Sequence, residues 1–221
     1  MYVRLVEPIM GYPRHRETLA QSSSWPCDPV TLCRELGGLA ERTGGGVACI
    51  YGPWAVEPLG GCSVNGGPES AVLKSLEWGL RLDYITGDMD LSPRLAMEVA
   101  YATRIYIAHL HGDNSHLRPP PAQVLAYSSQ VESWAPCVIG GLGFTDGDRA
   151  VILAMALDAS RVEAEGYWGP PDASHKDYKR AGYSKHVKLE LSKEIIKASA
   201  AALGYTLLER PTGFTLVKMR I

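Results

Sequence analysis

The segment LDYITGDMDLSPRLAMEVAYATRIYIAHLHGDN (82–114) decides the class of fold. Two short runs rich in β-branched and aromatic residues, 84–86 and 105–110, flank a helical pattern at 93–102 that begins with a Ser-Pro pair. A strand, a helix and a second strand in this order join neighbouring strands of a parallel sheet. The segment therefore predicts an α/β protein.

The same alternation continues on both sides of this segment. Further strands are expected from short apolar runs at 47–51, 62–65, 137–140 and 161–165. Further helices are expected at 68–80, at 146–159, and between Asp28 and the glycines at 44–46. We expect an open, mostly parallel sheet with helices on both faces.

The C-terminal part has a different pattern. Residues 166–184 are rich in Gly, Pro and polar residues and are expected to form a loop. A helix is expected next, at 185–203, followed by two short strands at 205–208 and 215–219. These elements predict a small closing unit, one helix and a hairpin, at the end of the chain.

The composition is that of an ordinary soluble globular protein, with 221 residues, of which 46% are hydrophobic and 21% charged. We expect one α/β catalytic domain over 46–221 and a helical extension, 1–45, packed on its core. No apolar run is long enough to cross a membrane, and the N-terminal residues lack the apolar stretch of a signal peptide. We therefore expect a cytoplasmic protein with no membrane partner.

The cysteines give little indication of metal or disulfide chemistry. The chain has five of them and no CxxC pair. This pattern predicts neither a disulfide framework nor a cysteine zinc site. We expect free, mostly buried thiols.

The charge of the chain is unevenly distributed. From His175 onward there are ten Lys and Arg residues against four Asp and Glu, although the overall net charge is −2. Because the whole chain is slightly acidic, this pattern favours a small phosphorylated ligand over nucleic acid. Lys185 and Lys188, near the start of the expected helix, are candidates for binding phosphate and closing over it as a lid. A solvated helix face is the alternative.

Three acidic clusters follow expected strands, at 87–90, 111–114 and 145–149. In an open parallel sheet, loops at the carboxyl ends of the strands converge and bind ligands there. Each Asp alone could be a turn or cap residue. Together, such carboxylates suit Mg²⁺, which keeps part of its shell for substrate phosphates, and Arg149 is a candidate for neutralising phosphate charge. The chain has neither a P-loop nor a GxGxxG motif, so neither a Walker ATPase nor a dinucleotide-dependent dehydrogenase is indicated.

The sequence HLHGD at 109–113 allows a second interpretation. Its HxHxD spacing resembles the metal motif of the metallo-β-lactamase-like hydrolases, which continues with a histidine where this chain has Asn114. Alternation within a strand would also place His109 and His111 on one face as a structural pair. The missing ligand makes zinc hydrolysis the weaker of the two interpretations.

Three segments taken together, VNGGPESAVLKSLEWGLRLDYITGDMD (64–90), HLHGDN (109–114) and GGLGFTDGDRAV (140–151), carry a family resemblance. The chain resembles the archaeal 6-hydroxymethyl-7,8-dihydropterin diphosphokinases, which are related to the thiamine diphosphokinases. The resemblance implies the fold of a thiamine diphosphokinase catalytic domain. It also implies Mg²⁺-dependent transfer of diphosphate from ATP to the hydroxymethyl group of a pterin, with release of AMP.

The resemblance also implies roles for individual residues. The expected metal ligands are Asp88, Asp90 and Asp113, and the expected nucleotide or phosphate residues are Gly52, Asp146, Asp148 and Arg149. Either Asp88 or Asp113 would accept the proton of the substrate hydroxyl. Asn114, with His111 beside it, is expected to contact the polar edge of the pterin.

Some alternatives stay open at this point. Thiamine could be the acceptor in place of the pterin, and the chain could be a nucleotide-binding module without catalytic activity. The expected partners are small molecules, ATP and a hydroxymethyl pterin, and a homo-oligomer is not ruled out.

Overall fold

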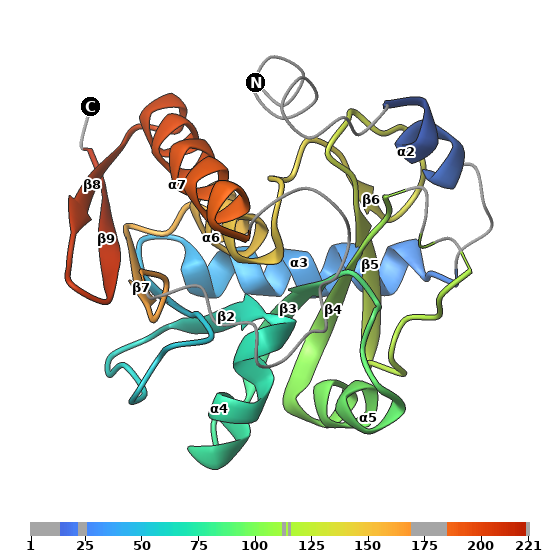
Figure 1. Ribbon diagram of the computed structural model, residues 1–221, viewed down its shortest axis with the longest axis horizontal. Helices are drawn as coiled ribbons and strands as arrows, with labels where there is room; N and C mark the ends of the chain where they lie inside the picture. Colours follow the sequence, from blue (N-terminus) through green and yellow to red (C-terminus); the bar gives the residue numbers. More distant parts are fainter. Residues whose placement is uncertain (1–13, 22–25, 112–113, 115, 169–184, 220–221) are drawn as a thin grey trace.

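The protein is an α/β structure built on a mixed sheet, seen in a computed structural model that describes residues 14–21, 26–111, 114, 116–168 and 185–219 (Figure 1). The described strands are β1 (Val47–Tyr51), β2 (Val64–Pro68), β3 (Leu82–Gly87), β4 (Thr103–His109), β5 (Val124–Ser128), β6 (Val138–Ile139), β7 (Arg161–Glu165), β8 (Tyr205–Glu209) and β9 (Gly213–Lys218). The described helices are α2 (Arg14–Gln21), α3 (Pro29–Thr43), α4 (Val72–Glu77), α5 (Pro93–Ala102), α6 (Asp146–Ala156) and α7 (Lys185–Ala202).

The nine strands of the described residues form one sheet in the order β6-β5-β4-β3-β2-β1-β7-β9-β8. All pairings from β6 to β7 are parallel, whereas β9 pairs antiparallel with both β7 and β8. The prediction of a mostly parallel sheet with a C-terminal hairpin is confirmed. Because the chain runs outward from β1 to β6 and then returns to place β7 on the other side of β1, its connections use both faces of the sheet.

Two groups of helices cover the two faces of the sheet. One buried core includes Leu39 of α3, Val151 of α6 and Ile196 of α7. The other includes Val72 of α4 and Val99 of α5, with Ala20 of α2 beside them. Helices on both faces were predicted and are confirmed.

The helices begin where their capping residues predict. Asp28 accepts hydrogen bonds from the backbone N of Val30 and of Thr31 at the start of α3, and Ser92 caps α5. Thr145 and Asp148 form a reciprocal capping box at the start of α6. No helix in the described part of the chain is long and apolar enough to cross a membrane.

The structure differs from the predicted elements around β2 and β5. The expected strand at 62–65 lies instead at Val64–Pro68, and the expected helix at 68–80 is reduced to a 3₁₀ turn (Glu69–Ala71) and the short α4. A Cβ at Gly66 would overlap the ring of Tyr84, so this strand needs glycine for close packing rather than residues of high β propensity. The strand β5 was not predicted.

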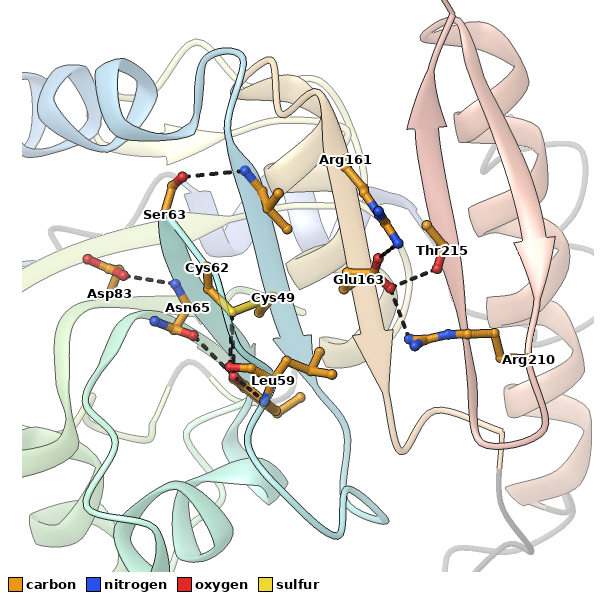
Figure 2. Close-up of a disulfide and its surroundings, with 12 residues drawn as sticks. Cys49, Leu59, Cys62, Ser63, Asn65, Asp83, Arg161, Glu163, Arg210 and Thr215 are labelled. Carbon is orange, nitrogen blue, oxygen red and sulfur yellow. Dashed lines mark hydrogen bonds and ion pairs between the residues drawn. A yellow bond between two sulfur atoms is a disulfide. The ribbon is translucent and has the colours of Figure 1, made fainter.

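The expectation of free thiols is wrong for four of the five cysteines. Cys27 is bonded to Cys137, and Cys49 to Cys62, whereas Cys33 is free and exposed. Figure 2 shows the second bond, which joins β1 to the loop before β2 beside Leu59. The two cysteines of this second bond are 13 residues apart in the sequence, and those of the first bond are 110 residues apart. No short sequence motif therefore marks either pair.

A group of paired charges joins β7 to the hairpin, and we call Arg161, Glu163, Glu165 and Arg210 the hairpin network. Arg210 Nη2 lies 3.2 Å from Glu163 Oε2 and 3.6 Å from Glu165 Oε2, and Arg161 pairs with Glu163. Thr215 Oγ1 on β9 donates to Glu163 Oε2 at 2.7 Å (Figure 2). Two carboxylates and two guanidinium groups therefore balance one another on this face of the sheet.

Candidate functional site

The carboxyl ends of the neighbouring strands β2 to β5 meet the N-terminus of α6 at one edge of the sheet. Thr86 Oγ1, near the end of β3, donates to the Asp146 carbonyl at 2.7 Å. Gln130, two residues after β5, donates from Nε2 to the Phe144 carbonyl at 3.3 Å. These bonds and those described below bring together the described residues of the segments 87–90, 111–114 and 145–149.

Arg149 on α6 connects two of the predicted site residues. Its Nη1 lies 2.8 Å from Asp146 Oδ1 and 3.6 Å from Asp88 Oδ1, and its Nη2 donates to the Phe144 carbonyl at 2.6 Å. The Arg149 side chain is 2% exposed, whereas those of Asp88 and Asp146 are 25% and 17% exposed. The guanidinium group thus holds the two carboxylates side by side while both remain accessible to solvent.

The turn that follows β3 has an unusual backbone. Met89, between Asp88 and Asp90, has a φ angle of 66°, in the left-handed region that a methionine rarely adopts. Its side chain is buried in the core with α4 and α5. Asp90 is exposed. Residues with such strained backbone cluster at functional sites.

Asn114 joins the loops that follow β3 and β4. Its Nδ2 donates to the carbonyls of Asp88, at 3.0 Å, and His109, at 2.6 Å, and its Oδ1 accepts from the His111 backbone N at 3.2 Å. The residue is 3% exposed. The amide group of Asn114 is used in these bonds. Its geometry therefore indicates that Asn114 positions Asp88, and it argues against the predicted contact with substrate.

Asp148 is fully buried within the cap of α6. Its Oδ1 accepts from the Phe144 backbone N at 2.6 Å and its Oδ2 from the Thr145 backbone N at 2.9 Å. Burial raises the pKa of this carboxyl group above its ordinary value. Both oxygens are used to shape the turn, which argues against the prediction that this side chain lines a nucleotide site.

His109 is part of the protein interior. Its Nδ1 lies 3.1 Å from the Ser128 carbonyl, which requires Nδ1 to donate, and its Nε2 lies 3.2 Å from Gln130 Nε2, from which it accepts. Burial, and then the nearby charge of Arg149, lower its pKa well below the usual value, so the ring is neutral. Both ring nitrogens are used by the protein, so His109 is not placed to bind zinc. His111 stacks on it, with 5.5 Å between ring centroids, and is partly exposed.

The turn after β1 is packed against the turn after β7. The Gly52 backbone N donates to the Glu165 carbonyl at 2.7 Å, and a Cβ at Gly52 would overlap the Gly166 backbone. The amide of Gly52 is therefore engaged within the fold, which argues against the predicted contact with nucleotide through this group.

Other predicted residues are placed only in part. Asp113 and the side chain of Lys185 lie outside the described residues. Lys188 is partly exposed on α7. The roles predicted for these three residues from the sequence stay predictions.

Sequence reasoning missed Glu69 and Tyr106. Glu69, 1% exposed, follows β2 directly, and the hydroxyl of the fully buried Tyr106 on β4 donates to its Oε1. Burial raises the pKa of Tyr106 well above its usual value, and the nearby charges of Glu69, Asp146 and Asp88 raise it further. Correct placement of the end of β2 would have pointed to Glu69. We call Glu69, Asp88, Asp146 and Arg149 the carboxylate cluster.

The donors of the carboxylate cluster fit Mg²⁺ in kind. Within the described residues, no group of three or more His, Cys, Asp or Glu side chains has the arrangement of a metal site. Mg²⁺ does not require one, because proteins bind it through one or two carboxylates and leave the other positions to water and phosphate oxygens. The partly exposed carboxylates of Asp88 and Asp146 meet that requirement.

Comparison with known proteins supports the resemblance seen in the motifs. The chain is 29% identical over 139 residues to a 6-hydroxymethyl-7,8-dihydropterin pyrophosphokinase of Pyrococcus furiosus. The resemblance to the archaeal pterin diphosphokinases is confirmed. The match covers 58% of this chain and 58% of the relative, and no family profile matches the chain.

Proposed function

We propose that the protein is an enzyme that transfers diphosphate from ATP to the hydroxymethyl group of 6-hydroxymethyl-7,8-dihydropterin, releasing AMP, with Mg²⁺ as the required cation. The observation that carries the proposal is the meeting of Asp88 and Asp146 on Arg149 at the carboxyl edge of the sheet. These residues belong to segments that resemble the pterin diphosphokinases, and the similarity to the Pyrococcus furiosus protein supports the same substrates.

The reaction needs little covalent chemistry from the protein. The pterin hydroxyl attacks the β-phosphorus of ATP, the bond from the β-phosphorus to the oxygen bridging to the α-phosphate breaks, and AMP leaves. Such a transfer depends on in-line positioning and on neutralising phosphate charge. Mg²⁺, when bound, supplies positive charge to the phosphate oxygens. Asp88, with Asp90 and Asp113, would hold it.

Arg149 has a different role from the one first expected. Its buried guanidinium group fixes Asp88 against Asp146, so the carboxylates are in place before the nucleotide binds. Asn114 does the same for the backbone of Asp88. Lys188 and Lys185 on α7 would bind the triphosphate, and Asp88 or Asp113 would take the proton of the attacking hydroxyl.

His111 is the better candidate for contact with the pterin. Asn114 is buried and its amide is used, whereas His111 is partly exposed in the same loop. The stacked His109 limits the orientations that the His111 ring can take.

The test is to follow nucleotide products in the presence of ATP and Mg²⁺ with either the hydroxymethyl dihydropterin or thiamine. AMP that forms only with the pterin supports the proposal. AMP that forms only with thiamine would reassign the acceptor, and ADP with a monophosphorylated product would indicate an ordinary kinase. Binding of ATP without turnover on either acceptor would indicate a module without catalytic activity.

A further inference from the structure

Glu69 is a buried carboxylate to which the proposed reaction assigns no role. It follows β2 directly and is 1% exposed, so it does not contact substrate. Removing a carboxylate from water is costly unless the fold gains from its presence. A neutral residue of the same shape would fill this position without that cost.

The side chain of Glu69 packs against the residue that precedes Asp88. A Cβ at Gly87 would overlap the carboxylate and the Cγ of Glu69, so the two can approach only because residue 87 is glycine. Gly87 has no positive φ angle, so the backbone conformation does not require glycine there. The glycine at the start of the Gly-Asp-Met-Asp turn is therefore needed to admit Glu69.

Tyr106 holds the far end of the Glu69 side chain. Its hydroxyl, buried on β4, donates to Glu69 Oε1. The high pKa of Tyr106, caused first by burial, keeps the hydroxyl protonated and able to donate. Glu69 thus reaches from β2 across Gly87 on β3 to β4, and the backbone of Asp88 follows directly from this bridge.

We propose that Glu69 is a positioning residue for Asp88, and that its negative charge strengthens binding of a Mg²⁺–nucleoside triphosphate complex at the carboxylate cluster; this rests on the proposed function. Charge is the reason for the strengthening. When Glu69 is ionised, its charge adds to those of Asp88 and Asp146 and attracts a divalent cation through a partly desolvated region where screening is weak.

The test compares Glu69→Gln with the unaltered protein in calorimetric binding of α,β-methylene ATP, which cannot be cleaved at the reacting bond, with and without Mg²⁺. Gln keeps the shape and an acceptor for Tyr106. We expect Mg²⁺-dependent affinity to fall at least about tenfold while the melting temperature stays the same or rises. Tyr106→Phe, which releases Glu69, should weaken binding less. Glu77→Gln on the exposed face of α4 is the matched control and should bind normally.

Two results would overturn the inference. One is equal Mg²⁺-dependent binding by Glu69→Gln and the unaltered protein. The other is equal loss of binding with and without Mg²⁺ together with a lower melting temperature, which indicates a structural role only. Turnover of the pterin is measured separately. If the unaltered protein binds the analogue with Mg²⁺, Glu69→Gln weakens that binding, and no pterin-dependent AMP forms, the proposed function fails and the inference stands.

Discussion

The carboxylate cluster and the hairpin network both combine buried or half-buried acidic groups with arginine, but their charges differ. In the hairpin network, Glu163 and Glu165 are matched by Arg161 and Arg210. In the carboxylate cluster, Arg149 pairs with Asp88 and Asp146, and Glu69 packs against Gly87, the residue before Asp88. A group of matched charges stabilises the fold, whereas partly exposed carboxylates at the carboxyl ends of parallel strands are suited to a cation.

The largest expected effect follows from removing the carboxylate of Asp88, which is partly exposed. Asp88→Asn should lower kcat by at least about a hundredfold, because it removes a charge that positions the cation. Asp113→Asn should have an effect of the same size. Thermal unfolding should be nearly unchanged in both. Near-normal turnover in both variants would remove these residues from the site.

The matched substitution in the hairpin network, Glu163→Gln, should lower stability and leave turnover unchanged. Glu163→Gln leaves Arg161 and Arg210 without their shared partner and should lower the free energy of unfolding by roughly 1–3 kcal/mol. Its turnover, measured below the unfolding temperature, should equal that of the unaltered protein. A turnover defect as large as that of Asp88→Asn would contradict the distinction between the two regions.

Replacing the arginine of each region tests whether the carboxylate cluster affects turnover while the hairpin network affects only stability. Arg149→Lys should lower kcat by about ten- to a hundredfold, because one ammonium group does not reproduce the contacts of Nη1 and Nη2. Arg210→Lys, the control, should change stability only and leave kcat unaltered. If Arg149→Lys retains full kcat, the arginine does not fix the carboxylates.

The carboxylate cluster borders His109, which should give the protein a measurable pH dependence. The pKa of His109 is lowered in the folded protein, mainly by burial, so the unfolded chain binds the proton more readily. The contribution of His109 to stability is therefore complete above the unfolded value of 6.5 and is lost as the pH falls below it. The loss is at most about 1.4 kcal/mol for each pH unit.

Urea unfolding of the unaltered protein and of His109→Gln over this range of pH measures the contribution. The stability difference between the two proteins should shrink as the solution becomes more acidic. A difference independent of pH would show that His109 titrates equally in the folded and unfolded states.

The smallest expected effect concerns the lysines at the start of α7. Replacing both Lys185 and Lys188 by Ala should raise the KM for ATP a few-fold, with a lower kcat, and most strongly at low ionic strength, where attraction to triphosphate is least screened. Lys197→Ala, which loses a pairing with Glu194 on the same helix, is the control. Unchanged kinetics at low salt would place the lysines on a solvated helix face.

Much of the fold could be predicted because local signals agreed with the tertiary structure. The caps Asp28 and Ser92 mark the starts of α3 and α5, and the strand at 161–165 was predicted with its observed bounds. The strand β2 was misplaced because its Gly66 serves close packing against Tyr84, which no propensity reveals. The disulfides were missed because their partners meet only in the folded chain.

The candidate site could be located from the sequence, but the roles within it could not all be assigned. Acidic clusters after strands point to the edge of the sheet where Asp88 and Asp146 meet Arg149. Whether a polar side chain faces solvent or the interior depends on neighbours from other strands, which is why Asn114 and Asp148 were assigned contacts that their hydrogen bonds argue against. Glu69 was missed for the same reason, because its partners Tyr106 and Gly87 lie on other strands.

The most direct test of the central claim is mass spectrometry of the products formed from ATP, Mg²⁺ and hydroxymethyl dihydropterin labelled with ¹⁸O at its hydroxyl. Attack of that hydroxyl on the β-phosphorus predicts a pterin diphosphate that retains the label, unlabelled AMP in equal amount, and loss of both products in Asp88→Asn. Absence of a pterin diphosphate from the unaltered protein under conditions in which it binds Mg²⁺ and ATP would contradict the account.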